Sequence, residues 1–289
     1  MPNPKISIII PTYNHGQELC KCLDSVFAQT FRDFEIIIIN DGSTDGTEKI
    51  LDDYLKTPPL PPSRGELGAT PPLRQAQGRL LPPSSVEIKI INQKNQGAPV
   101  ARNNGFKESK GEYVIFLDAD IVLRKDALEK MLGALGKNTP LTPLTRGELG
   151  NSPLPAHSFK GGIAYAYSDF KFGFKKFKLF PFDGKKLRKN NYIHTSALIR
   201  RDAFPAGGFD VSLKKFQDWD LWLTMLEEGH IGVWIPEVLF KVKQRKQGMS
   251  EWLPSFIYKI PWAKFGIKIK AIEKYEKWLE VVRNKHGLG

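Results

Sequence analysis

Four short apolar runs in the amino-terminal half of the chain each end in a loop rich in polar residues and glycine. The runs are Ile6–Ile10, Phe34–Ile39, Val86–Ile91 and Gly111–Leu117. Their length and their β-branched and aromatic content predict buried strands, and each is followed by a pattern typical of a helix. Strands that alternate with helices form a parallel sheet, and ligands bind beyond the carboxyl ends of its strands. We therefore expect an α/β fold whose four loops meet at one edge.

Two carboxylates, one residue apart, stand at the end of the fourth run, in Asp118-Ala119-Asp120. A carboxylate pair at a strand end suits a hard divalent cation that also holds phosphate oxygens. The same triplet is typical of a turn or of a helix N-cap, here for a helix expected near residues 124–135. The triplet alone therefore leaves a metal site and a cap equally open.

The loops after the other three runs carry motifs of their own. They read Pro11-Thr12-Tyr13-Asn14, then Asn40-Asp41-Gly42-Ser43-Thr44-Asp45-Gly46-Thr47, then Asn95-Gln96-Gly97 followed by Ala101-Arg102-Asn103. Together with Asp118-Ala119-Asp120 they resemble the motifs of family 2 glycosyltransferases, closely over residues 5–136 and more loosely over 190–250. The resemblance implies a GT-A fold, in which a mostly parallel central sheet is flanked by helices and a Rossmann-like nucleotide-binding half precedes an acceptor half. It also implies sugar transfer from a nucleotide diphosphate donor with inversion at the anomeric carbon.

The resemblance assigns residues to the donor site as well. It places the base and ribose between the Thr12 and Tyr13 loop and Asp41, whose carboxylate would accept a hydrogen bond from the base. Asp118 would contact the ribose or a metal-bound water, and Asp120 would bind Mg²⁺ or Mn²⁺ directly. The nucleotide-sugar-binding residues that it implies are Pro11, Thr12, Tyr13, Asn14, Asp41, Arg102 and Asp118. Uridine diphosphate sugars are the favoured donors.

A candidate catalytic base lies in the second half of the chain. A strand expected at Asn191–Ile199 and a short helix opened by Arg200-Arg201-Asp202 lead to the turn Gly207-Gly208-Phe209-Asp210. Next comes Phe216-Gln217-Asp218-Trp219-Asp220, which opens a helix that runs to Gly229. Members of the family usually carry Glu-Asp where this chain has Gln217-Asp218. We take Asp218 as the general base and Asp220 as its competitor; either could instead be a helix carboxylate stabilised by the dipole.

The chain departs from the family a second time near Met249, where family members often have Arg-x-His. Here Lys243-Gln244-Arg245 stands instead. Lys243 or Arg245 could contact the diphosphate, since cations stabilise phosphate charge. The third protein ligand of the metal stays open, and we do not assign His15 or His194 to it.

Two segments, 57–85 and 139–158, have no usable periodicity and share the core Arg-Gly-Glu-Leu-Gly. We interpret them as related low-complexity inserts at tolerant surface turns; a Pro-rich docking site is the alternative. The expected domain organisation is a catalytic domain over residues 1–250, interrupted by these inserts, and a basic amphipathic helical tail over 251–289.

The net charge of +12 is concentrated in two stretches. Residues 241–289 carry a net +8 and residues 169–189 a net +6, and both interleave lysines with aromatic residues. This mixture suits an anionic membrane surface better than nucleic acid, so we expect no nucleic acid partner. For 169–189, solvated lysines over ordinary core aromatics are the main alternative.

A helix is expected from about Trp262 to Asn284, with one apolar stripe. The stripe consists of Phe265, Ile269, Ile272, Leu279 and Val282. It either packs on the catalytic body or lies on a membrane, and both interpretations stay open.

The start of the chain runs straight into a strand, no stretch is apolar enough to span a bilayer, and the two cysteines suit a reducing compartment. We expect a cytoplasmic protein, in the sharper hypothesis peripheral on the inner face of the membrane.

The expected activity is therefore that of an inverting glycosyltransferase in cell-surface polysaccharide or glycolipid synthesis, with a saccharide or lipid-linked acceptor. A nucleotidyltransferase is one alternative, although the loop from Pro11 to Gly16 lacks the basic Gly-rich sequence that such enzymes show. A non-catalytic basic adaptor for membrane or nucleic acid is the other.

Overall fold

A computed structural model of the chain describes residues 3–56, 86–136, 162–243 and 270–288. Both predicted inserts, 57–85 and 139–158, lie outside the described residues, as does Arg245. The division into a catalytic domain and a tail at residue 250 also falls outside them and stays a prediction.

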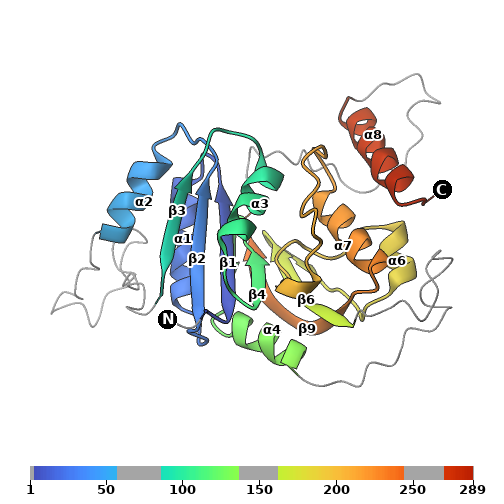
Figure 1. Ribbon diagram of the computed structural model, residues 1–289, viewed down its shortest axis with the longest axis horizontal. Coiled ribbons are helices and arrows are strands. Elements are labelled where there is room, and N and C mark those ends of the chain that lie inside the picture. The colour runs from blue at the N-terminus through green and yellow to red at the C-terminus, as the bar shows by residue number, and fades with distance from the viewer. Residues whose placement is uncertain (1–2, 57–85, 137–161, 244–269, 289) are drawn as a thin grey trace.

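The amino-terminal half is a parallel sheet with helices on both faces (Figure 1). Its elements are β1 (Ile6–Thr12), α1 (Gly16–Phe27), β2 (Phe34–Asn40), α2 (Thr47–Lys56), β3 (Ile88–Asn92), α3 (Ala98–Glu108) and β4 (Tyr113–Phe116). The strands lie in the order β3-β2-β1-β4 and pair in parallel. The four strands expected from the sequence are thus present, and their carboxyl ends meet at one edge.

The second half continues the same sheet with mixed strand directions. Its elements are β5 (Ile121–Leu123), α4 (Ala127–Gly136), β6 (Ile163–Phe172), β7 (Lys175–Phe177), α6 (Gly184–Lys189), β8 (Leu198–Arg200), the 3₁₀ turn η2 (Arg201–Ala203), α7 (Gln217–Glu227), β9 (Ile231–Val242) and α8 (Lys270–Lys285). The order continues β4-β8-β6-β9-β5, with β7 paired to β6. Only β6 and β9 pair in parallel here.

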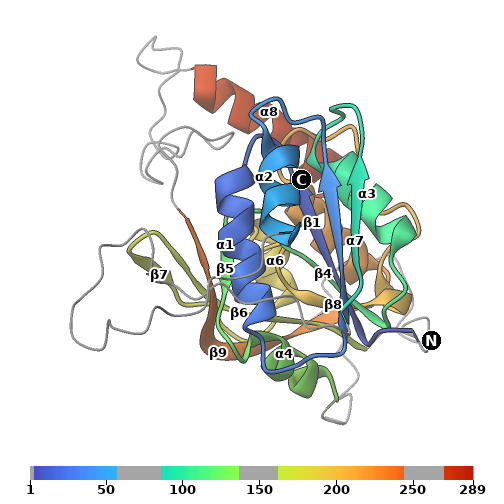
Figure 2. The same cartoon turned by 90° about the vertical axis from the view of Figure 1, so that its left-hand side faces the viewer.

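Alternation along β1 and β2 divides the interior into cores on the two faces of the sheet. Ile8 and Ile10 join α1 and α4 on one face, whereas Ile9 joins β4 and α7 on the other. Every residue of β1 and β2 is buried, as expected for parallel strands covered on both sides. Figure 2 shows α1 and α3 on opposite sides of these strands.

The strand expected at Asn191–Ile199 is wrong in extent, because only Leu198–Arg200 joins the sheet. The residues before it use side-chain hydrogen bonds instead of a strand ladder. Ser196 Oγ donates to the Phe116 carbonyl at 3.1 Å, and Trp222 Nε1 donates to the Ile193 carbonyl at 3.0 Å. The segment therefore passes between β4 and α7 as an irregular chain.

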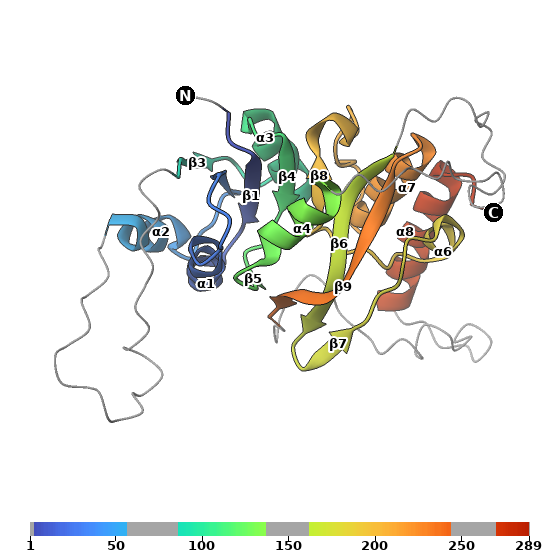
Figure 3. The same ribbon diagram turned by 90° about the horizontal axis from the view of Figure 1, so that it is seen from below.

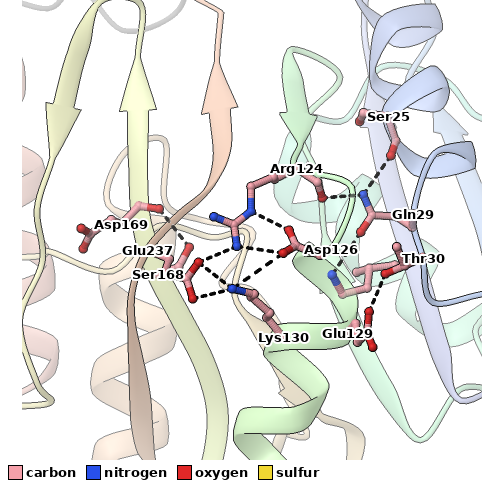
Figure 4. A network of polar contacts seen from close by, with 11 residues as sticks. Ser25, Gln29, Thr30, Arg124, Asp126, Glu129, Lys130, Ser168, Asp169 and Glu237 are labelled. Carbon is pink, nitrogen blue, oxygen red and sulfur yellow. Dashed lines mark hydrogen bonds and ion pairs between the residues drawn. The ribbon is translucent and has the colours of Figure 1, made fainter.

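The residues after Asp120 form the short strand β5 before the expected helix begins, at Ala127. β5 pairs antiparallel with β9, and a polar network holds the turn between β5 and α4 (Figure 4). Arg124 donates to Asp126 at 2.5 Å and to Glu237 of β9 at 2.7 Å, and Lys130 donates to Glu237 at 2.6 Å. Gln29 of the α1 loop donates to the Arg124 carbonyl at 2.8 Å. These contacts fix the chain on the carboxyl side of Asp120.

The carboxyl-terminal helix α8 packs on the body of the protein. Ile272 and Val282 are buried, Leu279 packs against the core beneath α7, and the Tyr275 ring lies 5.0 Å from Phe216. Of the two interpretations of the apolar stripe, packing therefore holds for its three described residues. No helix within the described ranges is long and apolar enough to cross a bilayer.

The end of α8 is held by an ionic cluster. Lys285 lies 2.7 Å from both Asp210 and Asp220, and His286 joins Asp220 at 2.9 Å to Glu227 at 2.8 Å. Asp220 and Glu227 belong to α7, so this cluster ties the carboxyl terminus to the helix that begins at Gln217.

Candidate active site

Asp41, at the end of β2, organises the neighbouring strand-end loop. Its Oδ1 accepts hydrogen bonds from the Gln96 amide at 2.9 Å and from Gln93 Nε2 at 2.7 Å, and its Oδ2 accepts from the Gly97 amide at 2.8 Å. Gly97 takes a φ of +91°, which favours glycine, directly before α3. A carboxylate has about four acceptor positions. One therefore remains for the base contact that the sequence predicts.

The loop after β1 is tied to the loop after β2. The Asn14 amide donates to Ser43 Oγ at 3.0 Å, and the Thr44 amide donates to Asn14 Oδ1 at 2.7 Å. Tyr13 is 45% exposed, whereas Thr12 is buried and its hydroxyl finds no hydrogen-bond partner among the described residues. Because unpaired buried polar groups are costly, this hydroxyl is a natural contact for a ligand.

Arg102 connects Asp118 of the carboxylate motif to Gln217, the residue before the candidate base. Its Nη2 donates to Asp118 Oδ1 at 2.7 Å and its Nη1 donates to Gln217 Oε1 at 3.2 Å, while its guanidinium lies 5.2 Å from the Phe209 ring. Only 8% of the Arg102 side chain is exposed, and its Nε has no partner in the described part of the chain. The nucleotide contact that the resemblance implied for Arg102 stays a prediction, and the structure gives Arg102 a bridging position.

The residue after Arg102 holds the turn before α7. Asn103 donates to the Phe209 carbonyl and accepts from the Phe209 amide, both at 2.8 Å. Gly208 in this turn has a φ of +64°, and a Cβ there would come 2.5 Å from Asn103 Oδ1. Two motifs far apart in the sequence are thus joined by adjacent residues of α3.

Asp218 lies in the first turn of α7, after Phe216 with a φ of +61°. Its Oδ1 accepts from the Trp219 amide at 2.9 Å, and its Oδ2 accepts from Asn191 Nδ2 at 2.7 Å. Burial raises the pKa of Asp218, although His194, these hydrogen bonds and Arg102 act in the opposite direction. A raised pKa makes a carboxylate a stronger base.

Asp220, the competing carboxylate, is engaged elsewhere. It is 3% exposed, and its Oδ1 contacts Lys285 and His286 of the carboxyl-terminal cluster. Asp218, by contrast, shares its surroundings with Arg102 and Asn191. The contacts of the two carboxylates therefore differ, and those of Asp220 hold α8 against α7.

His194 belongs to the site although the sequence assigned it no role. Its Nδ1 accepts from the Ser196 amide at 3.2 Å, and its ring lies between Phe170 and Phe240, at 5.2 and 5.0 Å. Burial lowers the pKa of His194, and the carboxylates of Asp118 and Asp218 offset this in part. The imidazole therefore lies near both carboxylates. Only tertiary structure brings it there, so no local pattern signals it.

Asp118 and Asp120 are the residues that could hold a divalent metal. Both are half-buried, and 38% of the Asp118 side chain is exposed. The described residues contain no group of three or more His, Cys, Asp or Glu side chains placed to bind a metal. Mg²⁺ is commonly held by one or two carboxylates together with substrate phosphates. The pair therefore fits a metal that arrives with its diphosphate.

Lys243 lies beside the same motif. Its amide donates to the Asp120 carbonyl at 3.0 Å, and its Nζ donates to Glu18 of α1 at 2.8 Å. The side chain is 49% exposed. Its predicted contact with the diphosphate stays a prediction.

The model of the family described as "Glycosyl transferase family 2" matches residues 7–64 and 71–207. The chain therefore belongs to glycosyl transferase family 2. It is 28% identical over 233 residues to the uncharacterized glycosyltransferase RT0329 of Rickettsia typhi. That match covers 79% of this chain and 61% of the relative. The first curated relatives, all glycosyltransferases by name, match over 116 to 141 residues, and the chain spans only 14% to 33% of their length.

Solved structures confirm the predicted GT-A fold. TarS 1-349 of S. aureus in complex with UDP-GlcNAc has a TM-score of 0.58 and 17% identity, covering 88% of this chain and 64% of that one. The mannosyltransferase PcManGT of Pyrobaculum calidifontis, in complex with GDP-Man and Mn²⁺, has a TM-score of 0.52 and 18% identity, covering 86% and 59%. At such identities the likeness concerns the fold.

Proposed function

We propose that this protein transfers a sugar from a nucleotide diphosphate donor to an acceptor hydroxyl, with inversion at the anomeric carbon. The observation that carries the proposal is the bridge made by Arg102 between Asp118 and Gln217, the neighbour of Asp218. This bridge supports the proposal that Asp118 and the candidate base act in one site. Family membership supports the same activity.

The donor would bind across the linked loops of β1 and β2. There the Asp41 carboxylate could accept one more hydrogen bond, and the buried Thr12 hydroxyl has no partner among the described residues. The similar structures bind UDP-GlcNAc in one case and GDP-Man in the other, so a nucleotide sugar is the donor class. Uridine diphosphate sugars are the first to test. Pro11, Tyr13, Asn14 and Lys243 complete the proposed contacts, with the last at the diphosphate.

In the proposed reaction the oxygen of the acceptor hydroxyl attacks the anomeric carbon while Asp218 accepts the proton of that hydroxyl. Asn191 and the Trp219 amide hold the carboxylate in place. Arg102 orients Asp118 through its hydrogen bond to Oδ1. Mg²⁺ or Mn²⁺, held by Asp118 and Asp120, would stabilise the charge on the leaving diphosphate; PcManGT, which is similar in fold, carries Mn²⁺.

The proposed acceptor is a saccharide or a lipid-linked saccharide, and the proposed setting is cell-surface polysaccharide or glycolipid synthesis at the inner face of the membrane. The tail helix would stabilise the catalytic domain, because Leu279 and Val282 of α8 join the core beneath α7.

A donor panel tests the proposal. Each nucleotide sugar is added with Mn²⁺, and the shift in melting temperature is measured; a ligand at a hundred times its Kd stabilises the fold by about 2.7 kcal/mol. The donor that binds is then incubated with acceptors. We expect release of free nucleoside diphosphate. Release of pyrophosphate would instead identify a nucleotidyltransferase, and no shift with any donor would contradict the proposal.

A further inference from the structure

The hairpin formed by β6 and β7 carries a basic and aromatic tip. Residues 170–180 contain four lysines, five phenylalanines and no acidic residue. Gly173, with a φ of +56°, makes the turn between the two strands. The hairpin is thus one of the two basic stretches of the chain, and the one that the structure describes in full.

The aromatic residues of this hairpin divide into two groups. Phe170 stacks on Phe177 at 4.8 Å and on Phe240 of β9 at 5.3 Å, so these rings are ordinary packing. Phe174 has a relative exposure of 104%, whereas the next most exposed large apolar residue of the described chain, Val211, has 61%. Core packing therefore explains the base of the hairpin and leaves Phe174 at its tip unexplained.

Exposed lysines surround this tip. Lys175, Lys176 and Lys178 are exposed, and Lys171 faces Lys176 across the hairpin. Asp169, the one nearby carboxylate of the hairpin, is buried and lies 3.9 Å from Lys176. Among the described residues, the surface around Phe174 is therefore strongly positive.

The tip also lies close to the candidate active site. The Gly173 amide donates to the Val242 carbonyl at 3.1 Å, and the next residue, Lys243, donates its amide to the Asp120 carbonyl at 3.0 Å. One strand end thus separates the hairpin turn from the carboxylate motif. Figures 2 and 3 show the hairpin projecting from the edge of the molecule.

We propose that the tip of the β6–β7 hairpin binds an anionic lipid bilayer, with Phe174 inserted at the headgroup level and the surrounding lysines in contact with anionic headgroups. An aromatic ring flanked by lysines suits the membrane interface. A single exposed ring offers too little apolar area for a stable protein interface, and the lack of acidic residues at the tip favours an anionic partner. The described residues of the α8 stripe, Ile272, Leu279 and Val282, are packed on the body instead.

Vesicle co-sedimentation of the full chain at low salt tests this proposal. Wild type is compared on vesicles of phosphatidylcholine alone and of phosphatidylcholine mixed with phosphatidylglycerol. One variant is Phe174→Ser, and the other combines Lys175→Glu, Lys176→Glu and Lys178→Glu. The matched controls are Val211→Ser, which removes an exposed apolar residue elsewhere, and the triple variant Lys49→Glu, Lys107→Glu and Lys214→Glu, which makes the same charge change away from the hairpin.

Wild type should bind only the vesicles that contain phosphatidylglycerol. Each lysine near an anionic surface contributes roughly fivefold in partitioning. Losing three should weaken binding about a hundredfold, and the added glutamates should weaken it further. Phe174→Ser should lose roughly tenfold. The controls should lose much less.

Three results would overturn the proposal. They are equal binding by wild type and both hairpin variants, no binding by wild type, and equal losses in the hairpin variants and their controls. Loss of binding to a nucleic acid duplex, with vesicle binding unchanged, would assign the tip to nucleic acid instead. The measurement needs neither donor nor acceptor, so its failure leaves the proposed sugar transfer untouched.

Discussion

Replacing His286 by glutamine removes the centre of the cluster that ties α8 to α7. Both ring nitrogens of His286 contact carboxylates, Asp220 at 2.9 Å and Glu227 at 2.8 Å, and 2% of the side chain is exposed. A neutral imidazole can donate from only one nitrogen, so the geometry requires the imidazolium. Burial alone would lower the pKa of His286, but the hydrogen bonds to Asp220 and Glu227 outweigh it and raise that pKa.

The expected loss follows from what each partner retains. A hydrogen bond to a charged group contributes about 1.5–3 kcal/mol. Asp220 keeps Lys285 at 2.7 Å, and Glu227 is 39% exposed and can be hydrated. His286→Gln should therefore cost about 2 kcal/mol, at the low end of that range. For a chain of this size the melting temperature should fall by roughly 4–8 °C.

This difference should depend on pH. The folded-state pKa of His286 lies above the unfolded value of about 6.5, so its stabilisation is complete below that pH and is lost as pH rises through the folded-state pKa. Thermal melts of wild type and His286→Gln across a pH series should converge at high pH.

His230→Gln is the matched control. Burial lowers the pKa of His230, so protonation disfavours the fold. Wild type should gain relative to this variant as pH rises from the folded-state pKa toward the unfolded value of about 6.5, which lies below the range in which the His286 contribution is lost. A His286→Gln difference that stays constant across the series, or that grows with pH, would refute the assigned charge.

Three further outcomes are expected. Asp120→Asn should keep the melting temperature, weaken donor binding in Mn²⁺ and remove most transfer; turnover like that of wild type would rule out its metal role. Arg102→Lys should lower kcat/KM by about tenfold or more, because an ammonium cannot reproduce the planar fork that joins Asp118 to Gln217; unchanged kinetics would show that the bridge is dispensable. Replacing residues 58–83 by a short Gly-Ser linker should leave activity and melting temperature nearly unchanged, and a large loss of either would mean that this segment packs on the site or controls access to it.

The donor half of the fold could be predicted from the sequence because its signals are local. A β-branched run followed by a polar loop reports the state of its own backbone, and four such runs in order predict a parallel sheet with its loops at one edge. Asp41 and Asp118 stand at strand ends that this pattern marks, whereas their roles and Arg102 were assigned through the resemblance to the family. Even so, the three hydrogen bonds that Asp41 accepts and the Arg102 bridge depend on neighbours far along the chain.

The acceptor half was harder to predict because its contacts are not local. The segment 191–197 contains Tyr192, Ile193 and Thr195, which favour a strand, but its groups find partners in β4 and α7. His194 has no sequence neighbours that suggest chemistry, and β5 is too short to show a period. An apolar stripe such as that of α8 has the same sequence pattern whether the helix lies on a membrane or packs on a protein. The burial of Ile272 and Val282 shows that these residues pack on the protein.

The central claim is that Asp218 is the base of a sugar transfer, and the pair Asp218→Asn and Asp220→Asn tests it most directly. Asparagine can still accept from the Trp219 amide, so donor affinity and folding should change little in the first variant. Its kcat should fall by about two orders of magnitude or more, a common contribution of a positioned base. Asp220→Asn weakens the contacts to α8 and should lower the melting temperature more than kcat. A far larger loss of kcat in Asp220→Asn than in Asp218→Asn would contradict the assignment.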